Sequence, residues 1–217
     1  MRIFLSLLAA LVLANTSAVA GSSYLALSFG TSYEDHKFDV WNGPATPGRR
    51  ALGAQARSRD YAVAIGFRDA FRLGERPFDV ELEIFERSNT AFTATGTAGN
   101  HPTTIRTTSM LASVWTNVAE ADRWLLKAGA GIGARHSSYH MAGPGVSFRA
   151  SDRAPYAMIG LRLSKQTGKR TTLFTELRAH SRPPIKSPGT GAFRSDPLEH
   201  NSKGLTLRVG LQIELGK

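Results

Sequence analysis

The 217-residue sequence contains no cysteine. It can therefore form neither a disulfide framework nor a thiolate metal site, and a cysteine nucleophile is excluded. Long apolar runs are also scarce. Outside the N-terminus, no segment approaches the roughly 20 consecutive apolar residues of a membrane-spanning helix, and the mean hydropathy is −0.20. The scarcity of long apolar runs does not exclude membrane-spanning strands, because only every second side chain of a strand needs to be apolar.

The N-terminus has the pattern of a secretory signal peptide. Arg2 supplies a positive start, residues 3–13 are apolar, and Ala18-Val19-Ala20 offers a small-x-small cleavage site. A membrane anchor helix is the alternative, but the apolar part is too short for one. We predict export, cleavage near Ala20, and two regions: a signal peptide over 1–20 and one domain over 21–217.

The C-terminal stretch, residues 205–215, alternates strictly. Six apolar residues occupy every second position from Leu205 to Leu215, and polar residues or glycine fill the positions between them. Successive side chains of a strand point to opposite faces, so this stretch predicts a strand with one apolar face and one polar face. Its length of about eleven residues is enough to cross a bilayer at a tilt.

Seven earlier segments share this alternation, some of them less cleanly, and each is predicted to be a strand. They cover residues 24–32, 61–68, 78–86, 106–118, 124–135, 156–164 and 173–180. The connections between the eight strands alternate in length: 69–77, 119–123 and 165–172 are short, whereas 33–60, 87–105, 136–155 and 181–204 are long. Short periplasmic turns alternating with longer external loops are typical of bacterial transmembrane barrels.

The pattern resembles small eight-stranded outer-membrane barrels, the OmpA-like and opacity-type surface proteins. The final strand also resembles the C-terminal assembly signal of such barrels, with matches at Arg208, Gly210, Ile213 and Leu215; it ends in Leu-Gly-Lys, where an aromatic residue is usual. The resemblance implies an all-β, eight-stranded antiparallel up-and-down transmembrane barrel in the outer membrane of a Gram-negative bacterium. It also implies recognition by the outer-membrane assembly machinery.

The polar faces of the predicted strands place charges of both signs inside the barrel. A barrel of eight strands is only wide enough for side chains to fill, and unpaired charges there are costly. We therefore predict a lumen plugged by an ion-pair network; a proton path or narrow channel is the alternative. The predicted network comprises Glu81, Glu83, Lys127, Arg135, Arg162, Glu176, Arg178, Arg208 and Glu214.

The formal charge of the chain is +10, and the excess of positive charge beyond the strands lies in the long connections. These connections would form a basic rim at one end of the barrel, and this rim is expected to contact outer-membrane lipid and lipopolysaccharide phosphates. The loops can also carry an external ligand. Nucleic acid is not an expected partner, because the chain is exported and has no basic recognition helix. Aromatic residues near the strand ends are predicted to form an interfacial belt: Tyr24, Tyr33, Tyr61, Phe78, Trp124 and Tyr156.

Two other motifs carry little functional weight. Gly129-x-Gly131-x-Gly133 continues a strand, whereas a phosphate-binding glycine loop must precede a helix. These glycines are expected to make room for large side chains of neighbouring strands. The histidines and serines of residues 136–140 lack a suitably spaced carboxylate. We therefore predict neither a cofactor nor a metal site.

His180 and Ser181 resemble part of the His, Ser and acid triad of lipid A deacylases, which are also outer-membrane barrels. In that family one residue separates the His from the Ser, so both lie on one face, whereas here they are adjacent. Glu199 is the candidate acid. A lipid A-modifying hydrolase is therefore the alternative to a non-enzymatic barrel with a structural or surface-interaction role, adhesin- or antigen-like, which is the function that we predict.

Overall fold

The structure is a computed structural model that describes residues 21–41, 49–96, 99–143, 146–187, 190–191 and 198–216. The predicted signal peptide lies outside these residues, so export and cleavage near Ala20 stay predictions. None of the described residues forms a helix long and apolar enough to cross a membrane.

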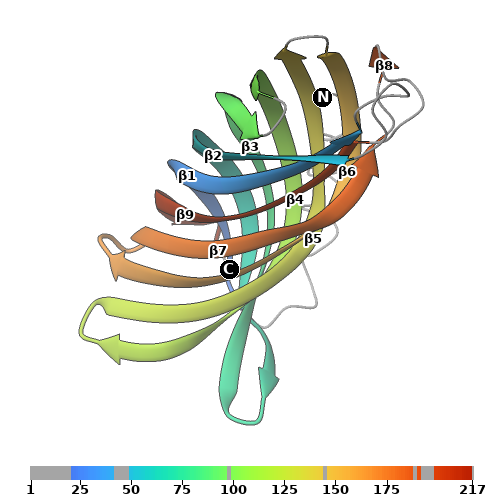
Figure 1. The fold of residues 1–217 in the computed structure, drawn as a ribbon. Helices are drawn as coiled ribbons and strands as arrows, with labels where there is room; N and C mark the ends of the chain where they lie inside the picture. Colours follow the sequence, from blue (N-terminus) through green and yellow to red (C-terminus); the bar gives the residue numbers. More distant parts are fainter. Residues whose placement is uncertain are drawn as a thin grey trace.

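Eight antiparallel strands close into a barrel, which confirms the predicted fold class (Figure 1). Each strand pairs with its neighbour in the chain, and the first strand pairs with the last. The eight are β1 (Ser23–Trp41), β2 (Arg49–Leu73), β3 (Arg76–Gly96), β4 (Gly99–Ala121), β5 (Trp124–Gly143), β6 (Val146–Gln166), β7 (Thr171–Ser187) and β9 (Leu198–Glu214). A ninth, two-residue strand, β8 (Thr190–Gly191), pairs with β6 outside this ring.

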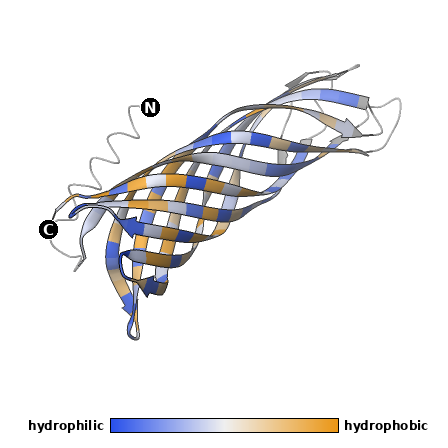
Figure 2. Ribbon diagram, turned by 90° about the vertical axis from the view of Figure 1, so that its left-hand side faces the viewer, coloured by the Kyte–Doolittle hydropathy of each residue, from blue (hydrophilic) through white to orange (hydrophobic). Residues whose placement is uncertain are grey.

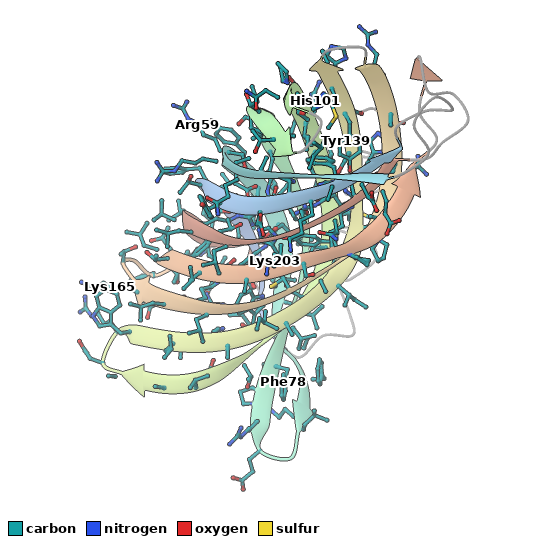
Figure 3. All side chains as sticks on the ribbon, viewed as in Figure 1. Arg59, Phe78, His101, Tyr139, Lys165 and Lys203 are labelled. Carbon is teal, nitrogen blue, oxygen red and sulfur yellow. The ribbon has the colours of Figure 1, made fainter. Side chains whose placement is uncertain are left out.

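The two ends of the barrel differ. At one end, which we call the tight-turn end, short turns join β2 to β3, β4 to β5 and β6 to β7. Two of these turns contain a residue with positive φ, Gly74 (62°) and Asp122 (52°), as tight hairpins require. The other end, the distal end, carries the remaining connections. In Figure 3, Phe78 lies near the β2–β3 turn, whereas Arg59 and His101 lie toward the distal end.

The strands are longer than the sequence predicts. The expected long loops over 87–105 and 136–155 are mostly strand: β3 and β4 are separated by only two residues, and so are β5 and β6. β1 and β2 likewise continue through most of the expected loop over 33–60. The prediction of long loops was wrong because the outward side chains of these extensions are polar. The contrast between the two faces, which marks a strand in the sequence, is therefore lost there.

An apolar band surrounds the part of the barrel nearest the tight turns (Figure 2). Its exposed side chains include Leu27, Val63, Ile132, Leu161 and Leu207. The outward residues then turn mostly polar toward the distal end: on β2, Tyr61 is followed outward by Arg59, Arg57 and Gln55. The strands thus continue beyond the band as a polar-surfaced distal extension.

The predicted aromatic belt is correct only in part. Tyr33, Tyr61 and Trp124 are exposed on the outer wall, as a belt requires. Tyr24 and Tyr156 are buried inside the barrel, at 1% and 2% exposure, because they share the inward parity of their strands. Both belong to the interior described next.

Candidate functional site: the charged barrel interior

The buried side chains of the described residues carry equal numbers of opposite charges. Seven are carboxylates: Glu34, Asp60, Asp79, Glu81, Glu83, Asp152 and Glu176. Seven are bases: Arg87, Lys127, Arg135, Arg162, Arg178, Arg182 and Arg208. A charge in a low-dielectric interior is tolerated only when it is paired and hydrogen-bonded. The geometry shows how this pairing is achieved.

The first group, which we call the lower network, lies at the level of the apolar band and begins at Glu81. Its carboxylate accepts two hydrogen bonds from Arg162, at 2.8 and 2.9 Å, and a third from the Tyr24 hydroxyl at 2.9 Å. Arg162 also donates from Nε to Glu176, at 2.7 Å. One guanidinium thus joins two carboxylates through its planar set of donors.

Glu83 forms the other half of the lower network. Arg178 donates to both of its oxygens, at 2.7 and 2.6 Å, and Arg208 donates to Oε1 at 2.8 Å. Arg178 also contacts Glu176, which connects Glu83 to the group around Arg162. Nearer the tight turns, Lys127 pairs with Asp79. Strands on opposite sides of the barrel are therefore linked through its centre.

Aromatic rings fill the space around these ion pairs. The Arg162 guanidinium lies 4.2 Å from the Trp115 ring and 4.7 Å from the Phe174 ring. Two glycines make room for them: a Cβ added at Gly129 would lie 2.4 Å from Trp115, and one added at Gly210 would lie 2.3 Å from Phe174. The close approach at Gly129 agrees with the expected spacing role of the glycine run.

Glu34 and Asp60 form a junction between the lower network and the distal extension. Arg135 donates to Glu34 at 3.0 Å, and Arg87 bonds the same carboxylate oxygen. Arg87 Nε also donates to Asp60 at 3.3 Å, while Arg208 Nη2 lies 3.2 Å from the other Asp60 oxygen. The junction therefore continues the charge pairing toward the distal end.

Beyond the junction lies a second group, the distal chamber: His36, Tyr139, Asp152, Arg182 and His200, with the rings of Phe38 and Phe92. Arg182 donates to His200 Nδ1 and to the Tyr139 hydroxyl. Because a guanidinium only donates, His200 Nδ1 accepts, and the proton of this neutral ring lies on Nε2. His200 Nε2 then donates to His36 Nδ1, 3.1 Å away.

The chamber disfavours protonation of its histidines. Burial lowers the pKa of His36 to about 4, and the nearby guanidiniums of Arg135, Arg87 and Arg182 add to the effect, although Glu34 opposes it. Burial and Arg182 likewise lower the pKa of His200 well below its usual value. Both rings are therefore neutral at pH 7 and act as stacking and hydrogen-bonding groups: His36 lies 5.0 Å from Phe92, and His200 lies 4.5 Å from Phe38.

Arg182 also connects two strands of the wall. The described pairing of β6 with β7 ends at Ala157 opposite Ser181, although both strands continue. Beyond that point Arg182 of β7 donates to Asp152 of β6, at 2.5 Å. A side-chain ion pair thus bridges these strands where no backbone pair joins them among the residues described.

The structure brings together eight of the nine predicted network residues; Glu214 is the exception. It lies at the tight-turn end, half-buried, 3.6 Å from Arg68 and apart from the central network. The sequence did not predict the distal chamber or the junction residues Glu34, Asp60 and Arg87, because these residues fall in the segments expected to be loops. The signal was the alternation of Glu34, His36 and Phe38 with polar outward neighbours.

The candidate catalytic residues do not converge. His180 is buried inside the barrel against Arg87 and Glu34, whereas the neighbouring Ser181 is exposed on the outer wall. Glu199 pairs with Asp39 and Lys186 in the strand register, well away from the pairing position of Ser181. No His, Asp or Glu cluster suited to a metal ion occurs within the described ranges.

The residues of the predicted assembly signal follow the parity of β9. Arg208 points inward into the lower network, and Leu215 is exposed. Gly210 lies against Phe174, and Ile213 pairs with Leu25 of β1 and Thr171 of β7. Recognition of this signal by an assembly machinery stays a prediction.

The ring of eight strands, the apolar outer band and the charged interior define the class of fold as an up-and-down transmembrane barrel of the outer-membrane type. Solved structures agree. OprG from Pseudomonas aeruginosa superimposes with a TM-score of 0.54 at 10% identity, over 91% of this chain and 98% of that one. A major outer membrane protein from Thermus thermophilus gives 0.53 at 10% identity, over 85% and 99%.

The outer membrane protease OmpT from Escherichia coli also matches, with a TM-score of 0.51 at 7% identity, over 93% of this chain and 99% of that one. No family model and no curated protein sequence matches the chain. At these identities the likeness establishes the fold alone, and proteins of different function share it.

Proposed function

We propose that the chain is a non-enzymatic outer-membrane protein, a closed barrel that presents its distal extension to the outside of the cell in a structural or surface-interaction role. The observation that carries the proposal is the balance of seven buried carboxylates and seven buried bases. Most of these charges are already engaged with one another, and the network crosses the barrel at several levels. Among the described residues, such an interior leaves no continuous column of free charges for ions to follow.

The outer wall supports the proposed location. Its apolar band matches what a bilayer requires of a barrel surface, and Tyr33, Tyr61 and Trp124 fit an interfacial position. Short turns face the periplasm and longer connections face outward in such barrels. The two longest separations between strands of the ring, 42–48 and 188–197, are both at the distal end, so the distal extension would face outward. Its polar wall, which carries Arg57, Arg59, Arg153 and Lys203, would then be available to an external partner.

Planar-bilayer recording tests the closed interior. Purified protein inserted into a lipid bilayer is expected to give no stepwise current of the size that a water-filled porin gives. A porin-like conductance that persists in repeated preparations would contradict the proposal.

Protease treatment of whole cells tests the orientation. Cleavage is expected only within the distal connections, residues 42–48, 97–98, 144–145 and 188–197. Cleavage at the tight turns of intact cells would reverse the proposed topology. Lipid A from cells with and without the protein, compared by mass spectrometry, is expected to carry the same acyl chains; a lost chain would favour the hydrolase alternative.

A further inference from the structure

Among the described residues, two arginines on the outer wall lack the ion-pair partners that some other exposed arginines have. Arg57 and Arg59 point outward from β2, two and one outward positions beyond Tyr61. Arg106, by contrast, donates to Glu86 at 2.8 Å, and Arg72 donates to Asp69 at 2.6 Å. Within the part of the chain that the structure describes, neither the Arg57 nor the Arg59 guanidinium forms an ion pair or hydrogen bond.

The two arginines line a groove together with apolar side chains. The groove has a volume of about 860 Å³ and is lined also by Phe29, Tyr61 and Leu207. Strand register explains the arrangement: Arg59 lies opposite Thr31 of β1, and Thr31 lies opposite Leu207 of β9. Basic groups therefore lie on the distal side of the groove and apolar groups on the side of the band.

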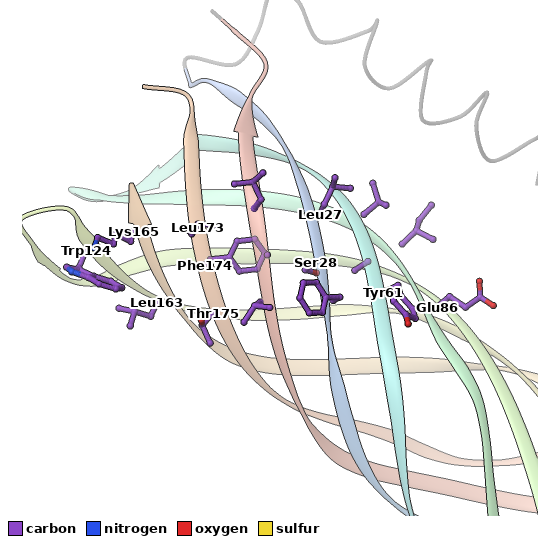
Figure 4. A pocket seen from close by; sticks show the side chains of 17 residues that line it. Leu27, Ser28, Tyr61, Glu86, Trp124, Leu163, Lys165, Leu173, Phe174 and Thr175 are labelled. Carbon is purple, nitrogen blue, oxygen red and sulfur yellow. The ribbon is translucent and has the colours of Figure 1, made fainter. Parts of the chain in front are cut away.

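A second, more apolar groove, whose lining side chains are shown in Figure 4, adjoins the first. The two share Phe29, Tyr61 and Val209, and the second is lined further by Leu27 and Leu173, among other residues. The result is one surface with two parts. Two guanidiniums without described partners lie where the apolar band ends, and a mainly apolar track leads from them into the band.

We infer that this surface binds a phosphorylated, multiply acylated lipid of the outer leaflet, namely lipid A. A guanidinium recognises phosphate through paired N–H donors, and two outward residues of one strand stand about 7 Å apart, so both can reach one head group. Acyl chains would lie along the track below. A soluble polyanion would pair with the two arginines but would not contact the apolar track. A phosphorylated lipid would contact both, so the combination favours a lipid.

This inference rests on the proposed function, because it requires the apolar band to lie in the membrane. The test uses the full mature chain in detergent micelles and native mass spectrometry, with bisphosphorylated lipid A as the probe. The unmodified protein is expected to retain bound lipid A. The double variant Arg57→Gln/Arg59→Gln is expected to retain it roughly tenfold less well or worse, the ratio that losing a charge-assisted contact predicts.

Two further variants make the result specific. Lys169→Gln/Arg170→Gln removes the same charge from exposed positions at the tight-turn end and is expected to bind like the unmodified protein. Arg57→Lys/Arg59→Lys keeps the charge but loses the planar donors, so its binding is expected to lie between the two. Equal retention by the unmodified protein and the Gln variant would overturn the inference, as would an equal loss in the tight-turn control.

The probes separate the possible ligands. Dephosphorylated lipid A is expected to bind weakly to every variant, and a sulfated oligosaccharide is expected not to compete; effective competition would assign the site to a soluble polyanion and overturn the inference. Insertion of each variant into liposomes is measured in parallel. Normal insertion without lipid A retention contradicts only this inference, whereas failure of the unmodified protein to insert contradicts the proposed function.

Discussion

The lower network and the distal chamber fill the same barrel with different chemistry. In the lower network, carboxylates and guanidiniums are matched with paired hydrogen bonds, as between Glu83 and Arg178. In the distal chamber the central groups are the neutral rings of His36 and His200, stacked with Phe38 and Phe92. The lower network is surrounded by the apolar band, and the chamber by a polar wall.

The difference follows from what surrounds each region. Where lipid would cover the wall, water cannot reach an interior charge through it, so a full charge is tolerated only beside an opposite charge. Where the wall is polar and water is near, a group that can change its protonation state is tolerated inside. We therefore expect the free energy of unfolding to fall strongly when a charge is removed from the lower network, and to depend on pH through the histidines of the distal chamber.

The largest effect is expected for Glu83→Gln. This change leaves Arg178 and Arg208 buried with their main carboxylate neutralised, and breaking a buried pair in this way typically costs about 3–5 kcal/mol. The free energy of unfolding in urea, followed by the mobility of folded and unfolded protein on gels, measures it. A loss no larger than that of a surface variant would show that the lower network contributes little to stability.

The second-largest loss of stability is expected at acidic pH, where the distal chamber should be destabilised. The pKa of His36 is about 4 in the folded state and about 6.5 unfolded, so between these values only the unfolded chain binds the proton. The free energy of unfolding should therefore fall as the pH drops from 6.5 to 4, by about 3 kcal/mol for this group alone. Unfolding curves at pH 7.5, 6 and 4.5 measure the slope.

The variant His36→Phe isolates the histidine contribution. It keeps a ring for stacking on Phe92 but cannot be protonated, so the dependence on pH should become shallower by about one proton. If the slope is unchanged, the acid sensitivity belongs to carboxylates elsewhere and the predicted difference between the two regions is wrong.

A smaller effect is expected for Tyr139→Phe in the chamber. The change removes the hydroxyl that accepts from Arg182 and lies 2.9 Å from His200 Nδ1, while the ring stays in place. Loss of a buried hydrogen bond typically costs about 1 kcal/mol. Urea unfolding at pH 7.5 measures it, and a cost equal to that of Glu83→Gln would remove the distinction between chamber and network.

The smallest effect is expected for Glu86→Gln on the outer wall. Its partner Arg106 is 2.8 Å away, but both side chains are exposed, and such pairs contribute about 0–1 kcal/mol. This variant is also the matched control for Glu83→Gln, since both sit on β3 and carry the same substitution. Added salt should reduce its already small effect further.

The parts of the fold that the sequence predicts well are those where the two faces of a strand differ. In residues 205–215 every outward position is apolar, and the structure confirms the strand, its parity and its pairing with β1. The same parity placed Glu81, Arg162 and Arg178 inside. Trp115, whose strand is less regular, also proves to be buried.

In the distal chamber this signal is weaker. His36 and His200 alternate with Lys37 and Asn201, so both faces look polar and the segments read as loops. The sequence also does not show which charged residues pair with one another inside the barrel. Alternation places Glu83 inside the barrel, but which arginine meets it depends on strand register, shear and side-chain length, none of which the local pattern encodes.

The sequence separation of the lower ion pairs has a consequence for how the barrel enters a membrane. Glu83 and Arg208 are 125 residues apart, and Glu81 and Arg162 are 81 apart. A β3–β4 hairpin inserted alone would carry both glutamates into lipid without the arginines of β6, β7 and β9 that pair with them in the folded barrel. Stepwise entry of isolated hairpins is therefore disfavoured, because Glu81 and Glu83 gain these partners only when β6 and β9 are also present.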